Sequence, residues 1–126
     1  MDDTKPQGQL VIQISAMPKD TNAHGDIFGG WLVAHMDMGA GIAGRDRAKS
    51  RVVTVAIDGL VFKRKVSVGD TVSCYADITN VGRTSMTINM QVWAKSIGND
   101  EFQHAAGGIF TFVAIDSQGR PQPVDR

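Results

Sequence analysis

The chain has 126 residues, about the length of one ordinary domain, and its 42% hydrophobic and 21% charged residues allow a folded core. The 13 basic and 13 acidic residues balance, which argues against a nucleic-acid-binding protein, because such proteins usually carry a basic excess. A lone cysteine excludes an intrachain disulfide and fits a reducing compartment. The polar start MDDTKPQGQ is typical of neither a secretory signal nor a transit peptide, and no apolar run approaches the roughly 20 residues of a membrane span. We therefore expect a single cytoplasmic domain over residues 1–126, with no membrane or nucleic-acid partner.

The chain opens with a predicted arm, a strand and a polar loop. Residues 1–8 are expected to form a loose arm, and residues 9–16 (QLVIQISA) a strand. The loop that follows supplies four polar side chains: Asp20, Asn22, His24 and Asp26. Asp26 is a candidate N-cap, so a long helix is predicted to start near residue 26 or 27 and to end within residues 44–50.

The predicted helix carries one acidic residue among apolar and small ones. Its apolar stripe has helical spacing and comprises Phe28, Trp31, Leu32, Met36 and Ile42. Asp37 lies on the small-residue side, where a carboxylate is costly to bury unless it is paired or used. Gly29 and Gly30 fall in the first turn, where each glycine costs about 1 kcal/mol of helix propensity. They indicate either a frayed helix start or the close approach of another group to free backbone N–H donors.

Four more strands are predicted after the helix, over residues 51–62, 71–79, 85–96 and 103–115. The last three follow one another through short turns and should be antiparallel neighbours. The pattern predicts an α+β fold in which an antiparallel sheet of about five strands wraps around one long central helix. The strand over 51–62 is long and β-branched, so we expect it to be a sheet edge that pairs with a second copy of the chain. The final segment, SQGRPQPVDR, is expected to run along the surface.

Three motifs in order carry a family resemblance. The segments DTNAHGDIFGGWLVAHMDMGAGIA, RVVTVAIDGLVFKRKVSVGD and VGRTS resemble the YciA-type acyl-CoA thioesterases, over about residues 14–115. The resemblance implies the hotdog fold and a broad-specificity hydrolase that cleaves acyl-CoA to free acid and CoA without a metal or other cofactor. It also implies dimers, often assembled as trimers of dimers. One departure is His24, where relatives commonly carry an uncharged residue.

The resemblance maps the catalytic pair of the family onto Asn22 and Asp37, contributed by opposite subunits. Asp37 fits a general base that deprotonates water, or a nucleophile that forms an anhydride. The alternative is an ion pair with Arg45 or Arg47, although eight or ten residues is a long spacing for one helix. Asn22 can orient the water or the thioester, and otherwise is an ordinary turn residue. The N–H groups of Gly29 and Gly30 suit an oxyanion.

Coenzyme A needs local cations for its phosphates. Basic residues cluster at 63–65, and Arg83 lies in a Gly-Arg-Thr-Ser turn whose N–H groups and hydroxyls suit a phosphate. As a charge run alone, 63–65 is more typical of a solvated turn. By resemblance, these regions line the CoA groove, with six candidate residues: Lys63, Arg64, Gly82, Arg83, Thr84 and Ser85.

Two other functions stay open at this point. A hotdog hydratase or dehydratase would need a histidine paired with an acid, for which His24 is the candidate. A non-catalytic acyl-CoA-binding module would not need both Asn22 and Asp37. His35, His104 and Cys74 are expected to be structural, and no His or Cys spacing indicates a metal site.

Overall fold

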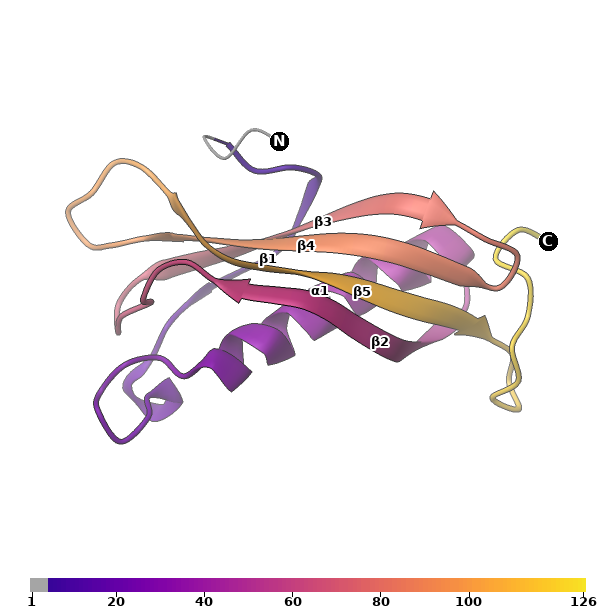
Figure 1. Cartoon of the computed structure of the whole chain (residues 1–126), viewed down its shortest axis with the longest axis horizontal. Helices are drawn as coiled ribbons and strands as arrows, with labels where there is room; N and C mark the ends of the chain where they lie inside the picture. The colour runs from indigo at the N-terminus through magenta and orange to yellow at the C-terminus, as the bar shows by residue number, and fades with distance from the viewer. Residues whose placement is uncertain (1–4) are drawn as a thin grey trace.

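The computed structural model describes residues 5–126 and shows one five-stranded antiparallel sheet crossed on one face by one long helix (Figure 1). The elements are β1 (Gln9–Ser15), η1 (Pro18–Asp20), α1 (Gly29–Ala48), β2 (Arg51–Phe62), β3 (Thr71–Val81), β4 (Ser85–Lys95) and β5 (Gln103–Ile115). The strand order is β1-β3-β4-β5-β2, so β1 and β2 form the two edges. Within the described residues, no helix is long and apolar enough to cross a membrane.

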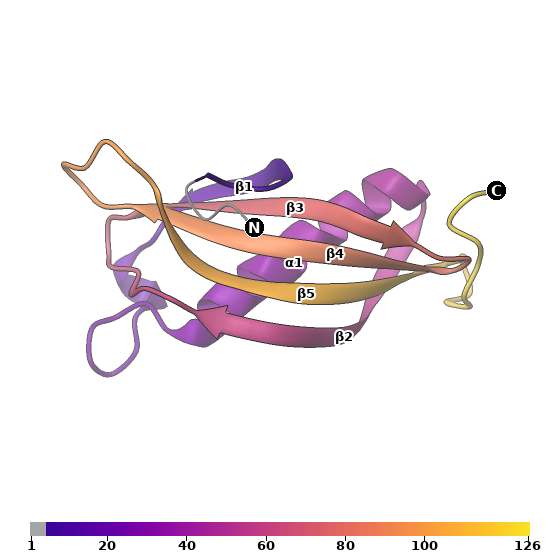
Figure 2. The ribbon, with the colours of Figure 1, turned by 45° about the horizontal axis from the view of Figure 1, so that its top comes forward.

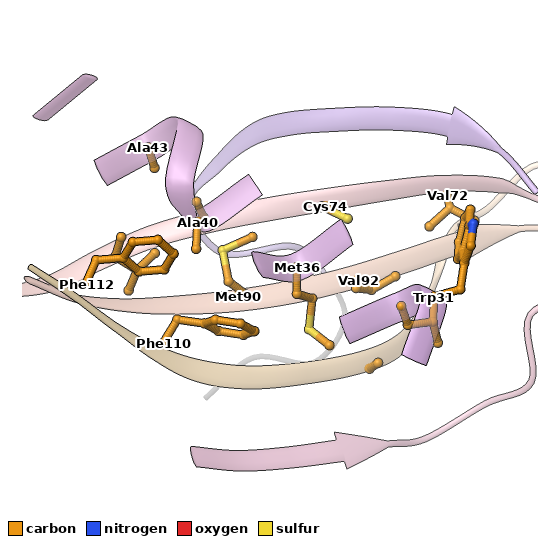
Figure 3. Close-up of a cluster of buried hydrophobic side chains, with 14 of the residues drawn as sticks. Trp31, Met36, Ala40, Ala43, Val72, Cys74, Met90, Val92, Phe110 and Phe112 are labelled. Carbon is orange, nitrogen blue, oxygen red and sulfur yellow. The ribbon is translucent and has the colours of Figure 1, made fainter. Parts of the chain in front are cut away.

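The core lies between α1 and the sheet, and Figure 2 shows from a tilted view how the helix lies along one face of the sheet. Alternate residues of each strand point to the same face, and in β4 these inward residues include Met90, which is fully buried. Figure 3 shows Met36 of the helix with Met90 and Phe110 of the sheet in this cluster. Burying a side chain of this size contributes about 1.5–3 kcal/mol. The helix lies so close to the sheet that a Cβ on Gly39 would approach Val11 within 2.9 Å.

The predicted strand pattern is confirmed in order and pairing. The strands predicted over 51–62 and 103–115 have those bounds, and the others differ by one or two residues at an end. The predicted helix start is wrong by two or three residues. The helix begins at Gly29, its N-cap residue is Phe28 with no side-chain cap, and Asp26 does not cap it. Phe28 is 42% exposed and therefore does not belong to the buried stripe, which begins at Trp31.

Both ends of the described chain are more firmly attached than the sequence predicts. The predicted loose arm lies partly outside the described residues, but Gln7 is half-buried and its N–H donates to Oε1 of Gln91 at 3.1 Å. The predicted surface segment also folds back, since Val124 is only 3% exposed and its N–H donates to the carbonyl of Arg83 at 2.8 Å.

The β2 edge of the sheet is strongly apolar. Its exposed hydrophobic side chains are 38–55% accessible and comprise Val53, Val55, Ile57, Leu60, Val61 and Phe62. An edge of twelve residues with free backbone groups and apolar side chains is a surface that needs a partner. The prediction that 51–62 is a sheet edge is confirmed.

Candidate active site

Asp37 lies in the third turn of α1 and is half-buried. Oγ1 of Thr54 donates a 2.6 Å hydrogen bond to its Oδ1, across the gap between the helix and β2. The alternative ion pair between Asp37 and Arg47 is wrong, because Arg47 pairs with Asp125 at 2.7 Å. Arg45 forms no ion pair with Asp37 among residues 5–126. Asp37 therefore keeps a carboxylate that one hydroxyl orients and that no cation in the described chain neutralises.

Thr54 is the site residue that sequence reasoning missed. It is exposed in the single chain, pairs with Phe112 of β5, and reaches the helix only through its hydroxyl, which contacts Asp37. The sequence held no clear signal for it, because strict alternation along the strand places Thr54 on the same side as Val52 and the polar Asp58, and a register shift follows Thr54. The strand periodicity alone also could not reveal that Asp37 on the helix lies opposite it.

Asn22 shapes its own loop. Its Oδ1 accepts hydrogen bonds from the backbone N–H groups of His24 at 2.8 Å and Asp26 at 3.2 Å, while its backbone N–H donates to the Asp26 carbonyl at 2.7 Å. Because these donors occupy the oxygen, the side-chain NH₂ group faces away from the turn. That NH₂ group donates no hydrogen bond within the part of the chain that the structure describes. Asn22 is thus both a turn residue and an exposed donor.

Asp20 anchors the start of this loop. Its side chain is buried, Oδ2 accepts the N–H of Met17 at 3.1 Å, and Oδ1 accepts Nζ of Lys19 at 3.1 Å. Burial works to raise the pKa of Asp20, but the hydrogen bonds from Lys19, Met17 and Trp31 outweigh it and lower the pKa below the ordinary value. At the other end of the loop, the Ile27 N–H donates to the Val66 carbonyl at 3.2 Å.

Gly29 and Gly30 form the exposed first turn of α1, as predicted. Their N–H groups have no backbone partner among the described residues, and they lie at the positive end of the helix dipole. A Cβ on Gly29 would lie 3.4 Å from the Phe62 ring, and one on Gly30 would lie 3.3 Å from the Phe28 ring. These contacts are to side chains, so nothing in the chain's own backbone packing demands two glycines here.

Lys63 and Arg64 lie beside this helix start. With Gly29 and Leu32 they line a hollow of about 330 Å³ between the end of β2 and the beginning of α1. The backbone N–H groups of Lys63 and Arg64 both donate to the Ala105 carbonyl, at 2.7 and 3.2 Å, which fixes the basic segment against β5. The structure therefore brings together the loop, the two glycines and these two cations at one end of the molecule.

The Gly82–Ser85 turn lies at the opposite end of the sheet (Figure 1). Gly82 N–H closes it by donating to the Ser85 carbonyl at 2.8 Å, and the guanidinium of Arg83 is exposed without a hydrogen bond or ion pair among residues 5–126. The eleven residues of β4 separate this turn from the other end of the sheet by about 35 Å. One chain thus cannot place Arg64 and Arg83 on the same phosphate.

Asn22 and Asp37 are also apart within the chain. Asp37 lies eight residues beyond the start of the helix, which is about 12 Å along the axis. In Figures 1 and 2 the loop of residues 21–27 projects past the helix start and beyond the β2 edge, away from the middle of the helix. The structure does not bring this pair together within one chain.

The remaining candidate groups pack as structural residues. His35 Nδ1 hydrogen-bonds to the Trp31 carbonyl at 2.8 Å, and the His104 ring stacks on Trp93 with centroids 5.0 Å apart. Cys74 is fully buried, and burial raises its pKa to about 12. His24 is exposed in the loop. Across the described ranges, no three His, Cys, Asp or Glu side chains are grouped to hold a metal ion.

Comparisons with known proteins agree with this architecture. The family model of the thioesterase superfamily matches residues 24–100. The acyl-CoA thioester hydrolase YciA of Salmonella typhimurium is 47% identical over 125 residues, covering 97% of this chain and 94% of the relative. A hexameric thioesterase from Yersinia pestis superposes with a TM-score of 0.91 at 47% identity, covering 94% of this chain and 97% of that chain. A hexameric broad-specificity acyl-coenzyme A thioesterase superposes with a TM-score of 0.90 at 43% identity, covering 97% and 84%.

A more distant match is the acyl-CoA hydrolase of Staphylococcus aureus. Its Asn-to-Ala mutant, solved with coenzyme A, superposes with a TM-score of 0.84 at 31% identity and covers 89% of this chain and 67% of that one. An Asp-to-Ala mutant of the same enzyme has a TM-score of 0.82. These matches confirm the predicted hotdog fold. The chain belongs to the thioesterase superfamily, among the YciA-type acyl-CoA thioester hydrolases.

Proposed function

We propose that this chain hydrolyses acyl-CoA thioesters to free carboxylic acids and CoA, with broad specificity. The observation that carries the proposal is Asp37, a helical carboxylate that is oriented by Thr54 and has no cationic partner in the described chain. The two residues substituted in the Staphylococcus aureus hydrolase, an asparagine and an aspartate, are fifteen positions apart. Asn22 and Asp37 have the same separation, which supports their assignment as the catalytic pair.

The chemistry follows from these groups. As a general base, Asp37 takes a proton from a water molecule while the water oxygen attacks the thioester carbonyl carbon. The carbonyl oxygen becomes an oxyanion, which the N–H groups of Gly29 and Gly30 and the side-chain NH₂ of Asn22 stabilise, at about 3 kcal/mol for a well-placed donor. The carbon–sulfur bond then breaks, the CoA thiolate leaves, and it takes up a proton. A direct attack by Asp37 would give a mixed anhydride that water hydrolyses.

The working unit in this proposal is a homodimer at minimum, joined along β2. The exposed apolar edge is covered when two copies pair antiparallel. The loop carrying Asn22 projects beyond this edge (Figure 2), so in such a pair it would reach the second copy. Asn22 of one subunit then meets Asp37 of the other. The hexameric state of the related thioesterases supports a trimer of dimers. A monomer at micromolar concentration in sedimentation would overturn both the assembly and the shared site.

Coenzyme A is bound by cations from two subunits in this proposal. Lys63 and Arg64 of one subunit bind one part of the nucleotide. The Gly82–Ser85 turn of another subunit binds a phosphate through the Arg83 guanidinium and the Thr84 hydroxyl. The separation of about 35 Å along β4 supports contributions from different copies, because one CoA cannot bridge both ends of a single chain here.

We place the protein in the cytoplasm, as one domain over residues 1–126 that needs no cofactor beyond its substrate.

The experiment is the release of free thiol from acyl-CoA, measured with a thiol reagent. Cys74, whose pKa is raised to about 12 by burial, leaves the background low. Wild-type protein should release thiol, and Asp37→Ala should lose a factor of roughly 100 to 10,000 in turnover. Asp46→Ala, which removes an exposed carboxylate of the same helix, is the matched control and should keep full activity. A change in the acyl group without thiol release would indicate a hydratase, and binding without either would indicate a sensor.

A further inference from the structure

Residues 120–126, which we call the returning segment, connect three parts of the fold that are distant in sequence. Val124 is 3% exposed and donates its N–H to the Arg83 carbonyl at 2.8 Å. The Arg126 guanidinium donates to the Ala48 carbonyl at the end of α1 at 2.9 Å. The Gln122 N–H donates to the Ala114 carbonyl of β5 at 2.9 Å. The segment thus joins the helix end, β5 and the turn between β3 and β4.

These bonds fix the peptide groups of the turn. The carbonyl of Arg83 accepts from Val124, and the carbonyl of Thr84 accepts from the Ala114 N–H at 2.9 Å. A trans peptide is planar and its C=O and N–H point in opposite directions. Because the Arg83 carbonyl points toward the returning segment, the Thr84 N–H points away from it. That N–H has no backbone partner among the described residues, and the preceding residue, Arg83, carries an exposed guanidinium without an ion pair there.

We propose that the returning segment positions the Gly82–Ser85 turn for a phosphate group of CoA, and that Val124 is its positioning residue. The inference rests on the proposed role of this turn in acyl-CoA binding. Val124 touches no substrate in this assignment. Its N–H holds the Arg83 carbonyl, and its buried side chain holds the segment in place, so that the Arg83 guanidinium and the Thr84 N–H converge on one anion.

The burial of Val124 does most of the anchoring. The ion pair of Arg47 and Asp125, 2.7 Å long, is exposed, and exposed pairs contribute little to stability. Val124 instead belongs to the buried core cluster. A charged residue at this position should expel the segment, whereas removal of the Asp125 charge should leave it attached.

The test compares acyl-CoA with the same acyl group on pantetheine, which lacks every phosphate. Val124→Asp should raise KM for acyl-CoA about tenfold, a loss typical of one hydrogen bond to a charged group, with kcat unchanged. Its kcat/KM for acyl-pantetheine should equal that of wild type. Val124→Ala should give a smaller rise in KM, and Asp125→Asn, the matched control, no rise. Adding Val124→Asp to Arg83→Ala should raise KM by less than Val124→Asp does in the wild-type chain, because only the Thr84 N–H is then left to be displaced.

The outcomes separate this inference from the function on which it rests. If Arg83→Ala leaves KM for acyl-CoA unchanged, the proposed role of the turn in CoA binding is wrong. If Arg83→Ala raises KM but Val124→Asp and Val124→Ala do not, the turn binds CoA and the positioning role is wrong. A parallel loss on acyl-CoA and acyl-pantetheine in both Val124 variants would also overturn the inference, because it indicates a general loss of structure.

Discussion

Subunit complementation is the sharpest prediction of a site shared between two chains. Asn22→Ala and Asp37→Ala should each be almost inactive as homodimers, because every site lacks one member of the pair. When the two variants are mixed and exchange subunits, a mixed dimer holds one site with both residues and one site with neither. Equal mixing with random pairing makes half of the dimers mixed, so about a quarter of wild-type activity should return.

The structure supplies the geometric reason. Asp37 lies about 12 Å along the helix axis from the helix start. Asn22 lies in the loop that projects still further away in both views (Figures 1 and 2). Groups that act on one thioester must lie within hydrogen-bond reach of it, roughly 3 Å or one bridging water. The two side chains of one chain therefore cannot serve the same carbonyl in this conformation.

The assay is thiol release after dissociation and reassociation of the mixed variants, with exchange verified by mass or by tags on each chain. Each variant carried alone through the same treatment is the control for reactivation. A mixture that stays inactive despite verified exchange would place both residues of a site within one chain, and would require the loop to fold back along α1.

Three further predictions test individual contacts. Thr54→Val should lower kcat roughly 10- to 100-fold without unfolding the protein, because it removes the hydrogen bond that orients Asp37, and a wild-type kcat would contradict this role. Gly30→Ala should raise or preserve the unfolding temperature, since alanine gains about 1 kcal/mol of helix propensity. Its new methyl, 3.3 Å from the Phe28 ring, should nevertheless lower kcat about tenfold by crowding the N–H donors, and full activity would refute the oxyanion assignment. Asp20→Asn should lower the unfolding temperature most at neutral pH: the folded-state pKa of Asp20 is depressed, so its stabilisation is complete above the unfolded-state pKa and disappears as pH falls through the folded-state pKa. A pH-independent difference between this variant and wild type, measured by thermal unfolding, would argue against that linkage.

The strands were predictable because their sequence signals are local and mutually consistent. Residues 51–62 form a β-branched run bounded by a basic turn, and residues 103–115 follow a turn of polar residues. The predicted first and last residues of both strands therefore agree with the structure. The helix start was less predictable. Asp26 is a suitable N-cap by type, but in the structure it closes a turn with Asn22, and the competing local hydrogen bonds delay the helix to Gly29.

Two of the contacts that sequence reasoning missed join residues distant along the chain. Thr54 meets Asp37 only because the helix crosses β2 at that point, and Val124 meets Arg83 only because residues 120–126 turn back over the sheet end. Neither periodicity nor spacing contains such long-range pairings. Asp37 could be identified from sequence because a lone carboxylate in an apolar helix is anomalous in itself.

The β2 edge links assembly to catalysis. A twelve-residue apolar edge exposes the chain to uncontrolled pairing, and burying it in a specific dimer removes this hazard. The same edge presents Thr54, and through it Asp37, while the Asn22 loop reaches past the edge and away from its own helix. If the edge is covered by a second copy, the proposed site is completed by the contact that protects the fold. A free subunit would then lack both the protected edge and a competent site, so loss of pairing should abolish hydrolysis even with every residue of the site intact.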